Sequence, residues 1–153
     1  MSIAIALHML TATIWVGGMF FAYMALRPVA VSLFEPPQRL PLWRDVFSKF
    51  FPWVWISVVV LLGTGYWMAF KLFGGFATFP LYVNIMHGLG ILMVLLFMHV
   101  YFAPFKRMKR AIAAGDLPTA GAKLAQIRII IGVNLSLGLI VIAVASGGRY
   151  YVN

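Results

Sequence analysis

This sequence of 153 residues contains no cysteine and only three acidic residues. The missing cysteines exclude disulfides, thiolate metal sites and thiol redox chemistry. The scarcity of charge is more informative, because 10% of the residues are charged, whereas a soluble domain carries about 25%. The chain is instead 63% hydrophobic, a composition typical of a protein embedded in a lipid bilayer.

Four hydrophobic segments are long enough to cross a bilayer, which requires about 20 apolar residues. They occupy residues 3–26, 51–70, 81–103 and 129–146, and they leave no room for a separate soluble domain. The first segment differs from a secretory signal peptide, because it lacks a positively charged start and its apolar run is too long. The sequence therefore predicts an all-α fold, a single four-helix transmembrane bundle over residues 1–153.

Basic residues are concentrated in two of the connections between these segments. The positive-inside rule places such connections in the cytoplasm, so both termini are predicted to face outward from the inner (cytoplasmic) membrane. The net charge of +9 is therefore interpreted as a topology signal and not as a sign of nucleic-acid binding. The ten basic residues in these connections are Arg27, Arg39, Arg44, Lys49, Lys106, Arg107, Lys109, Arg110, Lys123 and Arg128, and only Lys71 and Arg149 lie on the other side.

The first basic connection contains its own helical pattern. Pro36, Pro37 and Pro41 interrupt the chain there. The apolar residues around and after them have the spacing of a short helix lying in the cytoplasmic interface. These apolar residues are Leu40, Trp43, Phe47 and Phe50.

Two histidines are expected at the same depth near the outer face. His8 lies five residues after Ile3 and His87 five residues after Tyr82, near the outer starts of their segments, so both are roughly 7–8 Å below the boundary at about 1.5 Å rise per residue. His99 lies twelve residues after His87, roughly 18 Å deeper, and on a different helix face. A polar or ionisable residue inside a membrane is costly and indicates a functional site. Two neutral imidazoles facing each other suit a b-type haem iron or a copper ion.

Other residues near this level complete a predicted binding slot. Glycines allow a helix or a flat ligand to approach the backbone closely. Residues at i+3 and i+7 from His8 share its helix face. The two outer cations suit the propionates of a haem. The predicted site comprises His8, His87, Thr11, Trp15, Gly63, Gly65, Gly88, Lys71 and Arg149, with Gly90 also at this level.

Each feature also has a simpler structural interpretation. A histidine in a transmembrane helix can serve only to hydrogen-bond a neighbouring helix, and Asn134 or Ser57 is a suitable partner for His99. Glycines are often packing contacts. The methionines at the outer level are either apolar filler or soft metal ligands. These methionines are Met9, Met68 and Met86.

The sequence resembles the CopD type of copper-resistance membrane protein over nearly its whole length. The first element is LHMLTATIWVGGMFFAYMALRP at residues 7–28, which matches a family pattern of a histidine, a W-x-G-G element and a closing proline. Two later elements, TGYW at 64–67 and GVNLSLG at 132–138, are similar to stretches of the family's later helices. The resemblance implies a helical membrane protein connected with copper.

A more distant resemblance is to the HemJ type of protoporphyrinogen oxidase, a four-helix membrane protein that binds haem b. His8 corresponds to its first-helix histidine, and His99 resembles a further histidine of its third helix. The family's important third-helix lysine falls at Gly88, beside His87. This departure argues against the same enzyme activity, whereas a neighbouring histidine still suits an axial haem ligand.

The interpretation that the residues favour is a membrane-embedded b-type haem protein with a redox role at the outer face. His8 and His87 are the predicted metal ligands, and a quinol or a periplasmic redox partner is the expected exchange partner, in a monomer or a homo-oligomer. If the protein is an enzyme, it is a haem-dependent membrane oxidoreductase. The alternatives are a copper-binding or copper-transport protein that uses the histidines and methionines for Cu(I), a HemJ-like oxidase, and an assembly protein without a cofactor.

The charge distribution makes a topology prediction. Reporter fusions at Asn153 are expected to signal from the outer side, and fusions within residues 107–123 from the cytoplasm, because the basic connections stay inside. A cytoplasmic signal from Asn153 would reverse the predicted orientation.

Overall fold

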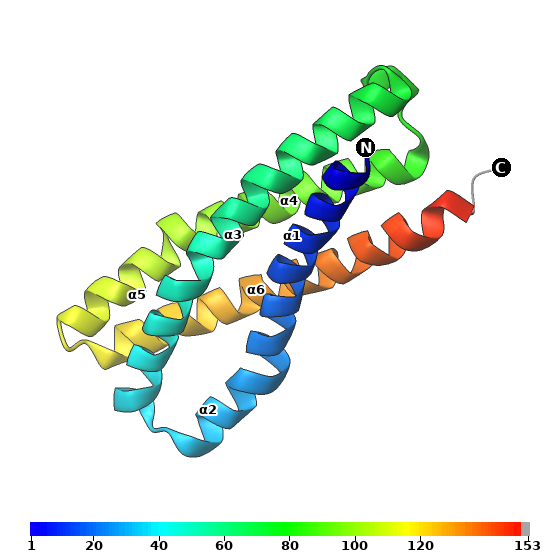
Figure 1. The fold of residues 1–153 in the computed structure, drawn as a ribbon. Coiled ribbons are helices and arrows are strands. Elements are labelled where there is room, and N and C mark those ends of the chain that lie inside the picture. The colour runs from blue at the N-terminus through cyan, green and yellow to red at the C-terminus, as the bar shows by residue number, and fades with distance from the viewer. Residues whose placement is uncertain (151–153) are drawn as a thin grey trace.

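The computed structural model describes residues 1–150, except for the side chain of Arg149, and the described part is helical without any strand. Four helical spans in this part are long and apolar enough to cross a membrane: Ser2–Leu33, Pro36–Phe73, Leu81–Ala113 and Leu117–Gly147. Figure 1 shows the N-terminus and the C-terminal end of the last span directed toward the end of the bundle that carries the connection between the second and third spans. The α2–α3 and α5–α6 connections lie at the opposite end. This arrangement confirms the predicted multi-pass helical membrane fold.

The first span consists of α1 (Ser2–Phe21), a π-helical turn η1 (Ala22–Leu26) and α2 (Arg27–Leu33) without a break. Pro28 explains the turn, because a proline has no N–H to donate to the carbonyl four residues earlier. The preceding N–H, that of Arg27, bonds instead to the carbonyl of Ala22, five residues back. Such π-bulges often lie at functional sites.

The second span is one long helix, α3 (Pro36–Phe73). The separate interfacial helix expected in the first basic connection is therefore wrong, because its apolar residues form the beginning of this span. Leu40, Trp43 and Phe47 are buried in the core instead of lying along a membrane surface. Pro41 and Pro52 lie inside the helix. Packing against neighbouring helices makes such prolines tolerable in membrane helices.

Helix α3 ends at Gly74, whose φ of 80° is the left-handed conformation that glycine adopts readily. A short 3₁₀ helix, η2 (Phe76–Thr78), then leads into α4 (Leu81–Phe102). A kink at Ala103 and Pro104 separates α4 from α5 (Pro104–Ala113), which runs along the bundle beyond the expected end of the third segment.

The last span, α6 (Leu117–Gly147), begins twelve residues earlier than its apolar run, which was predicted to start at residue 129. Asp116 is the reason, because its carboxylate accepts a hydrogen bond from the Thr119 N–H and caps the helix. Hydrogen bonding to Thr119 lowers the pKa of this exposed carboxyl. A final 3₁₀ turn, η3 (Gly148–Tyr150), follows α6.

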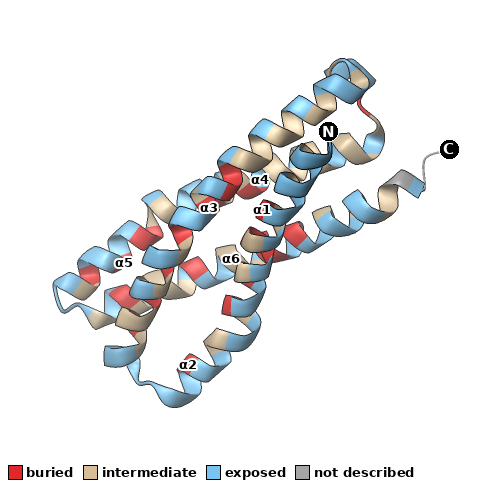
Figure 2. Cartoon of the chain, in the orientation of Figure 1, coloured by how far each residue is buried: buried red, intermediate tan, exposed pale blue. Residues whose placement is uncertain are grey.

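The densest packing lies in the middle of the bundle and toward the basic end. Figure 2 shows the buried residues gathered there, where the helices meet, while the outward faces are exposed. The centre is a cluster of aromatic rings in which Phe51 contacts Phe47, Phe97 and Phe105 at centroid distances of 5.0, 5.5 and 4.8 Å. Many large apolar side chains remain exposed, which is expected for surfaces that face lipid.

Gly138 of α6 lies where three helices approach closely. A Cβ atom added there would lie 2.8 Å from Val16 Cγ2 of α1 and 3.2 Å from Met93 Cε of α4. The small residue therefore lets three helices meet, as glycines commonly do in membrane bundles.

Replacing Gly138 with Ala is expected to destabilise the bundle by about 1–3 kcal/mol, because the added methyl overpacks this contact. Thermal unfolding in mild detergent measures the effect. Gly17→Ala is the matched control on α1, since a Cβ at Gly17 meets nothing within 4 Å. Equal melting temperatures for Gly138→Ala and Gly17→Ala would contradict the assigned packing.

Candidate metal-binding cavity

A cavity of about 310 Å³ lies between α1, α3, α4 and α6, toward the end of the bundle that carries the termini. His8 of α1 and His87 of α4 both line it. Two histidines separated by 79 positions in the sequence therefore share one cavity, as equal depth predicts. Most of the remaining lining is apolar.

His8 is half-buried and is held by α3. Its Nδ1 lies 2.9 Å from the Thr64 hydroxyl oxygen. The Thr64 hydroxyl already donates its proton to the Val60 carbonyl at 2.6 Å. Since a threonine hydroxyl has one proton, its oxygen accepts from the Nδ1–H of His8. This assignment leaves the lone pair of His8 Nε2 free to act as a metal ligand.

His87 is also held by α3, through the half-buried hydroxyl of Tyr66, two positions after Thr64. The Tyr66 hydroxyl and His87 Nε2 lie 2.8 Å apart and share a hydrogen bond. The Tyr66 and Phe76 rings lie 5.5 and 5.8 Å from the imidazole, centroid to centroid. These aromatic rings fix the plane of the imidazole. The other ring nitrogen, Nδ1, has no hydrogen bond among the described residues.

Three more predicted residues lie close to this arrangement. Trp15 lines the cavity, as does Gly65, where an added Cβ would lie only 3.2 Å from His8 Cε1. Gly65 therefore provides the space that the His8 ring occupies. Thr11 is buried behind His8, and its hydroxyl donates to the carbonyls of Leu7 and His8. Thr11 thus supports the backbone and does not line the cavity.

The other predicted residues lie elsewhere. Gly63 and Gly88 are exposed on outward helix faces, and no atom lies within 4 Å of a Cβ added at either position. Lys71 lies over the Trp67 ring at 5.0 Å instead of at the cavity. Arg149 lies in η3, and its side chain is outside the described part of the structure. Gly63 and Gly65 are two positions apart in the sequence, so the periodicity of a helix places them on different faces.

His99 is exposed on the membrane-facing surface of α4. The predicted partners Asn134 and Ser57 form no hydrogen bond with it among the described residues. Asn134 instead donates to the Met93 carbonyl at 3.2 Å. The other amide atom, Asn134 Oδ1, is buried without a partner among the described residues.

The sequence alone did not reveal the two hydroxyls that hold the histidines or one of the methionines that line the cavity. Thr64 and Tyr66 flank Gly65 in the TGYW stretch, so their neighbourhood was recognised but their role was not. Met93 lines the cavity together with Met68 and Met86, whereas Met9 is 64% exposed. No periodic pattern distinguishes a methionine that faces a cavity from one that faces lipid. Only the packing of four helices makes that distinction.

The family model for copper resistance protein D (CopD) matches residues 44–147, which is more than half of the chain. The chain therefore belongs to the CopD family, and the resemblance to that family is confirmed over the matched residues. The matched region contains His87, Thr64, Tyr66 and the three cavity methionines, whereas His8 lies before it. Neither the curated proteins nor the solved structures include a match.

The Thr64 contact predicts the protonation of His8. In ¹⁵N-histidine NMR spectra of the protein in detergent, His8 is expected to be protonated on Nδ1 and unprotonated on Nε2. Thr64→Val should abolish this preference, because valine offers no acceptor, while Thr64→Ser should preserve it. A spectrum that Thr64→Val leaves unchanged would contradict the assigned hydrogen bond.

Proposed function

We propose that this protein handles copper, and that Cu(I) binds as its substrate in the cavity between α1, α3, α4 and α6. The observation that supports this proposal is the set of donors around one cavity. Two imidazoles and three thioethers line it, from His8, His87, Met68, Met86 and Met93. Membership of the copper resistance protein D family supports the same choice of metal.

The chemistry of the donors favours Cu(I) over other metals. Thioether and imidazole ligands suit soft copper, whereas carboxylate and water ligands suit magnesium, calcium or manganese. Neither an aspartate nor a glutamate lines the cavity among the described residues. The described part of the chain also lacks any group of three or more histidine, cysteine, aspartate or glutamate residues that could hold a metal. A metal with more than two side-chain ligands in this cavity would therefore use the methionine sulfurs, and such a donor set favours Cu(I).

The hydrogen bonds to α3 prepare the imidazoles for this role. A metal-binding histidine usually donates its second ring N–H to a fixed acceptor, which orients the ring and selects the tautomer. Thr64 provides such an acceptor for His8 at 2.9 Å. The apolar surroundings favour a singly charged ion, because the cost of moving an ion from water into a low-dielectric site rises with its charge.

The b-type haem favoured by the residues alone is less well supported than copper. The cavity methionines have no part in a bis-histidine haem, and the expected glycine at 88 and cation at 71 lie away from the cavity. With the basic end in the cytoplasm, the copper cavity lies toward the periplasmic face of the inner membrane. This position suits exchange of the ion with a periplasmic partner.

Binding of Cu(I) to the purified protein in mild detergent tests the proposal, with a competing Cu(I) chelator as the readout. His8→Ala and His87→Ala are each expected to lower the affinity by about 100-fold or more, since loss of a residue that only hydrogen-bonds to a metal ligand already costs about 10–100-fold. Met86→Leu should lower it as well, because leucine keeps the apolar volume but removes the sulfur.

Matched controls come from residues of the same types outside the cavity. His99→Ala and Met9→Leu should leave the affinity unchanged, since both side chains are exposed. Equal losses in His99→Ala and His87→Ala would contradict the site. A protein purified with a Soret band that His8→Ala and His87→Ala remove would overturn copper in favour of haem.

A further inference from the structure

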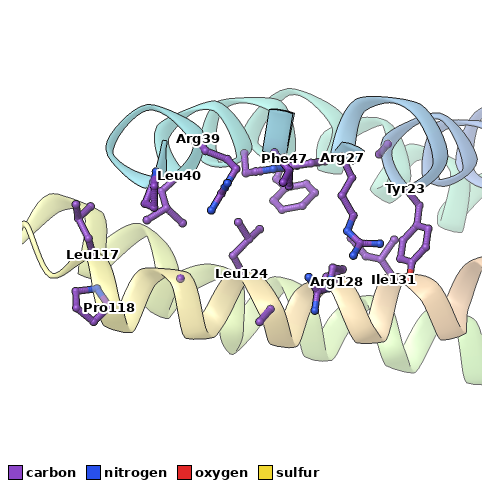
Figure 3. A pocket seen from close by; sticks show the side chains of 16 residues that line it. Tyr23, Arg27, Arg39, Leu40, Phe47, Leu117, Pro118, Leu124, Arg128 and Ile131 are labelled. Atoms are coloured by element: carbon purple, nitrogen blue, oxygen red, sulfur yellow. The ribbon is translucent and has the colours of Figure 1, made fainter. Parts of the chain in front are cut away.

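A larger cavity, of about 510 Å³, lies at the opposite, basic end of the bundle. Figure 3 shows it between α6 on one side and the segments from η1 to α3 on the other. Arginines from three different spans line it: Arg27 of α2, Arg39 of α3 and Arg128 of α6. In Figure 3 these side chains extend into the space between the helices. Helix packing thus gathers cations that are up to 101 positions apart in the sequence.

The positive charge of this cavity is not neutralised by the protein. Neither an aspartate nor a glutamate is among the described residues that line it. The only salt bridge among the described residues joins Arg44 and Asp45. Arg39 donates to the Phe34 carbonyl at 3.3 Å, which orients its guanidinium but does not neutralise it. Three guanidinium groups around one space are a favourable setting for an anion, because each can donate paired hydrogen bonds to oxygen atoms.

The π-helical turn positions one of these arginines. Arg27 Cζ lies 5.1 Å from the centre of the Tyr23 ring, and both residues line the cavity. The Tyr23 ring in turn packs on Gly132 of α6, where an added Cβ would lie 3.1 Å from Cε2. The turn created by Pro28 therefore supplies a cation and an aromatic wall to the same cavity.

The remaining walls are apolar. Leu40, Trp43 and Phe47 come from α3, and Leu124 and Ile131 come from α6. A small hydrophilic anion gains nothing from contact with such apolar walls. An anion with a hydrocarbon chain can contact the arginines through its charge and the apolar walls through its chain. Basic pockets between transmembrane helices on the cytoplasmic side are suited to the headgroups of acidic lipids.

We propose that this cavity is a binding site for an acidic phospholipid of the cytoplasmic leaflet. The phosphate group lies among Arg27, Arg39 and Arg128, and an acyl chain lies against the aromatic and aliphatic walls. This site is separate from the copper cavity at the other end of the bundle, so either proposal can fail without the other.

Native mass spectrometry of the protein, released from nanodiscs of phosphatidylglycerol and phosphatidylcholine in equal amounts, tests the site. The wild type is expected to retain one phosphatidylglycerol in preference to phosphatidylcholine. The combined variant Arg27→Gln, Arg39→Gln and Arg128→Gln should lose this preference by about tenfold or more, because charge-assisted hydrogen bonds are replaced by weaker ones. The charge-matched control Lys106→Gln, Arg107→Gln and Arg110→Gln should retain it, since these residues are exposed and do not line the cavity.

A second variant fills the cavity without changing any charge. Gly121 lines the cavity, and a Cβ there meets nothing within 4 Å, so leucine can enter the space. Leucine also has a higher helix propensity than glycine, which protects folding. Gly121→Leu should displace the bound lipid, while Gly17→Leu, where a Cβ also meets nothing, should not.

The lipid retained by these variants either supports or overturns the proposed site. Loss of bound phosphatidylglycerol in the arginine variant and in Gly121→Leu, with both controls intact, supports the cavity site. Equal loss in the two charge variants would reduce the effect to general surface charge and overturn the proposal. Displacement of the lipid by inorganic phosphate at comparable concentration would assign the site to free phosphate and also overturn it.

Discussion

The end of the bundle that carries the N-terminus and the α3–α4 connection depends on the hydrogen bonds between α3 and the two histidines. A bilayer offers no water to a polar group, so an imidazole among apolar helices needs a partner from the protein. Thr64 provides that partner for His8, and Tyr66 provides it for His87. Helix α3 therefore joins α1 and α4 at this level through polar contacts, in a region that has fewer buried residues than the middle of the bundle.

In these contacts the two nitrogens of one imidazole have different roles. A ring nitrogen that bonds to α3 holds the helices together, and the other nitrogen of the same ring remains available to a ligand. His8 shows this division clearly, because Thr64 accepts from Nδ1 and thereby selects the tautomer with a free Nε2. A single histidine can thus both hydrogen-bond a neighbouring helix and bind a ligand.

The two ends of the bundle differ in their chemistry. The end with the termini has soft, uncharged donors around a small cavity, and the other end has guanidinium groups around a larger one. Between them lies the aromatic packing around Phe51, which fills the centre of the bundle. The two proposed ligands, Cu(I) and an acidic phospholipid, have opposite charges and therefore suit different surroundings.

The sequence by itself determined the class of protein, the four spans, the family and the candidate histidines. The class, the spans and the histidines follow from composition, from the length of apolar runs and from equal depth along helices of constant rise. The family follows from the resemblance of sequence elements such as TGYW at 64–67. Helix limits were less predictable, because Pro41 does not end α3 and Asp116 starts α6 ahead of its apolar run. Only the tertiary structure decided which side chains face the cavities. In α1, α4 and α6 the apolar residues are spread around the helix, since one side contacts lipid and the other contacts protein, so the pattern that reveals the inner face of a soluble helix is missing. For that reason Met93 and Met9, or Gly65 and Gly63, are distinguished by packing alone.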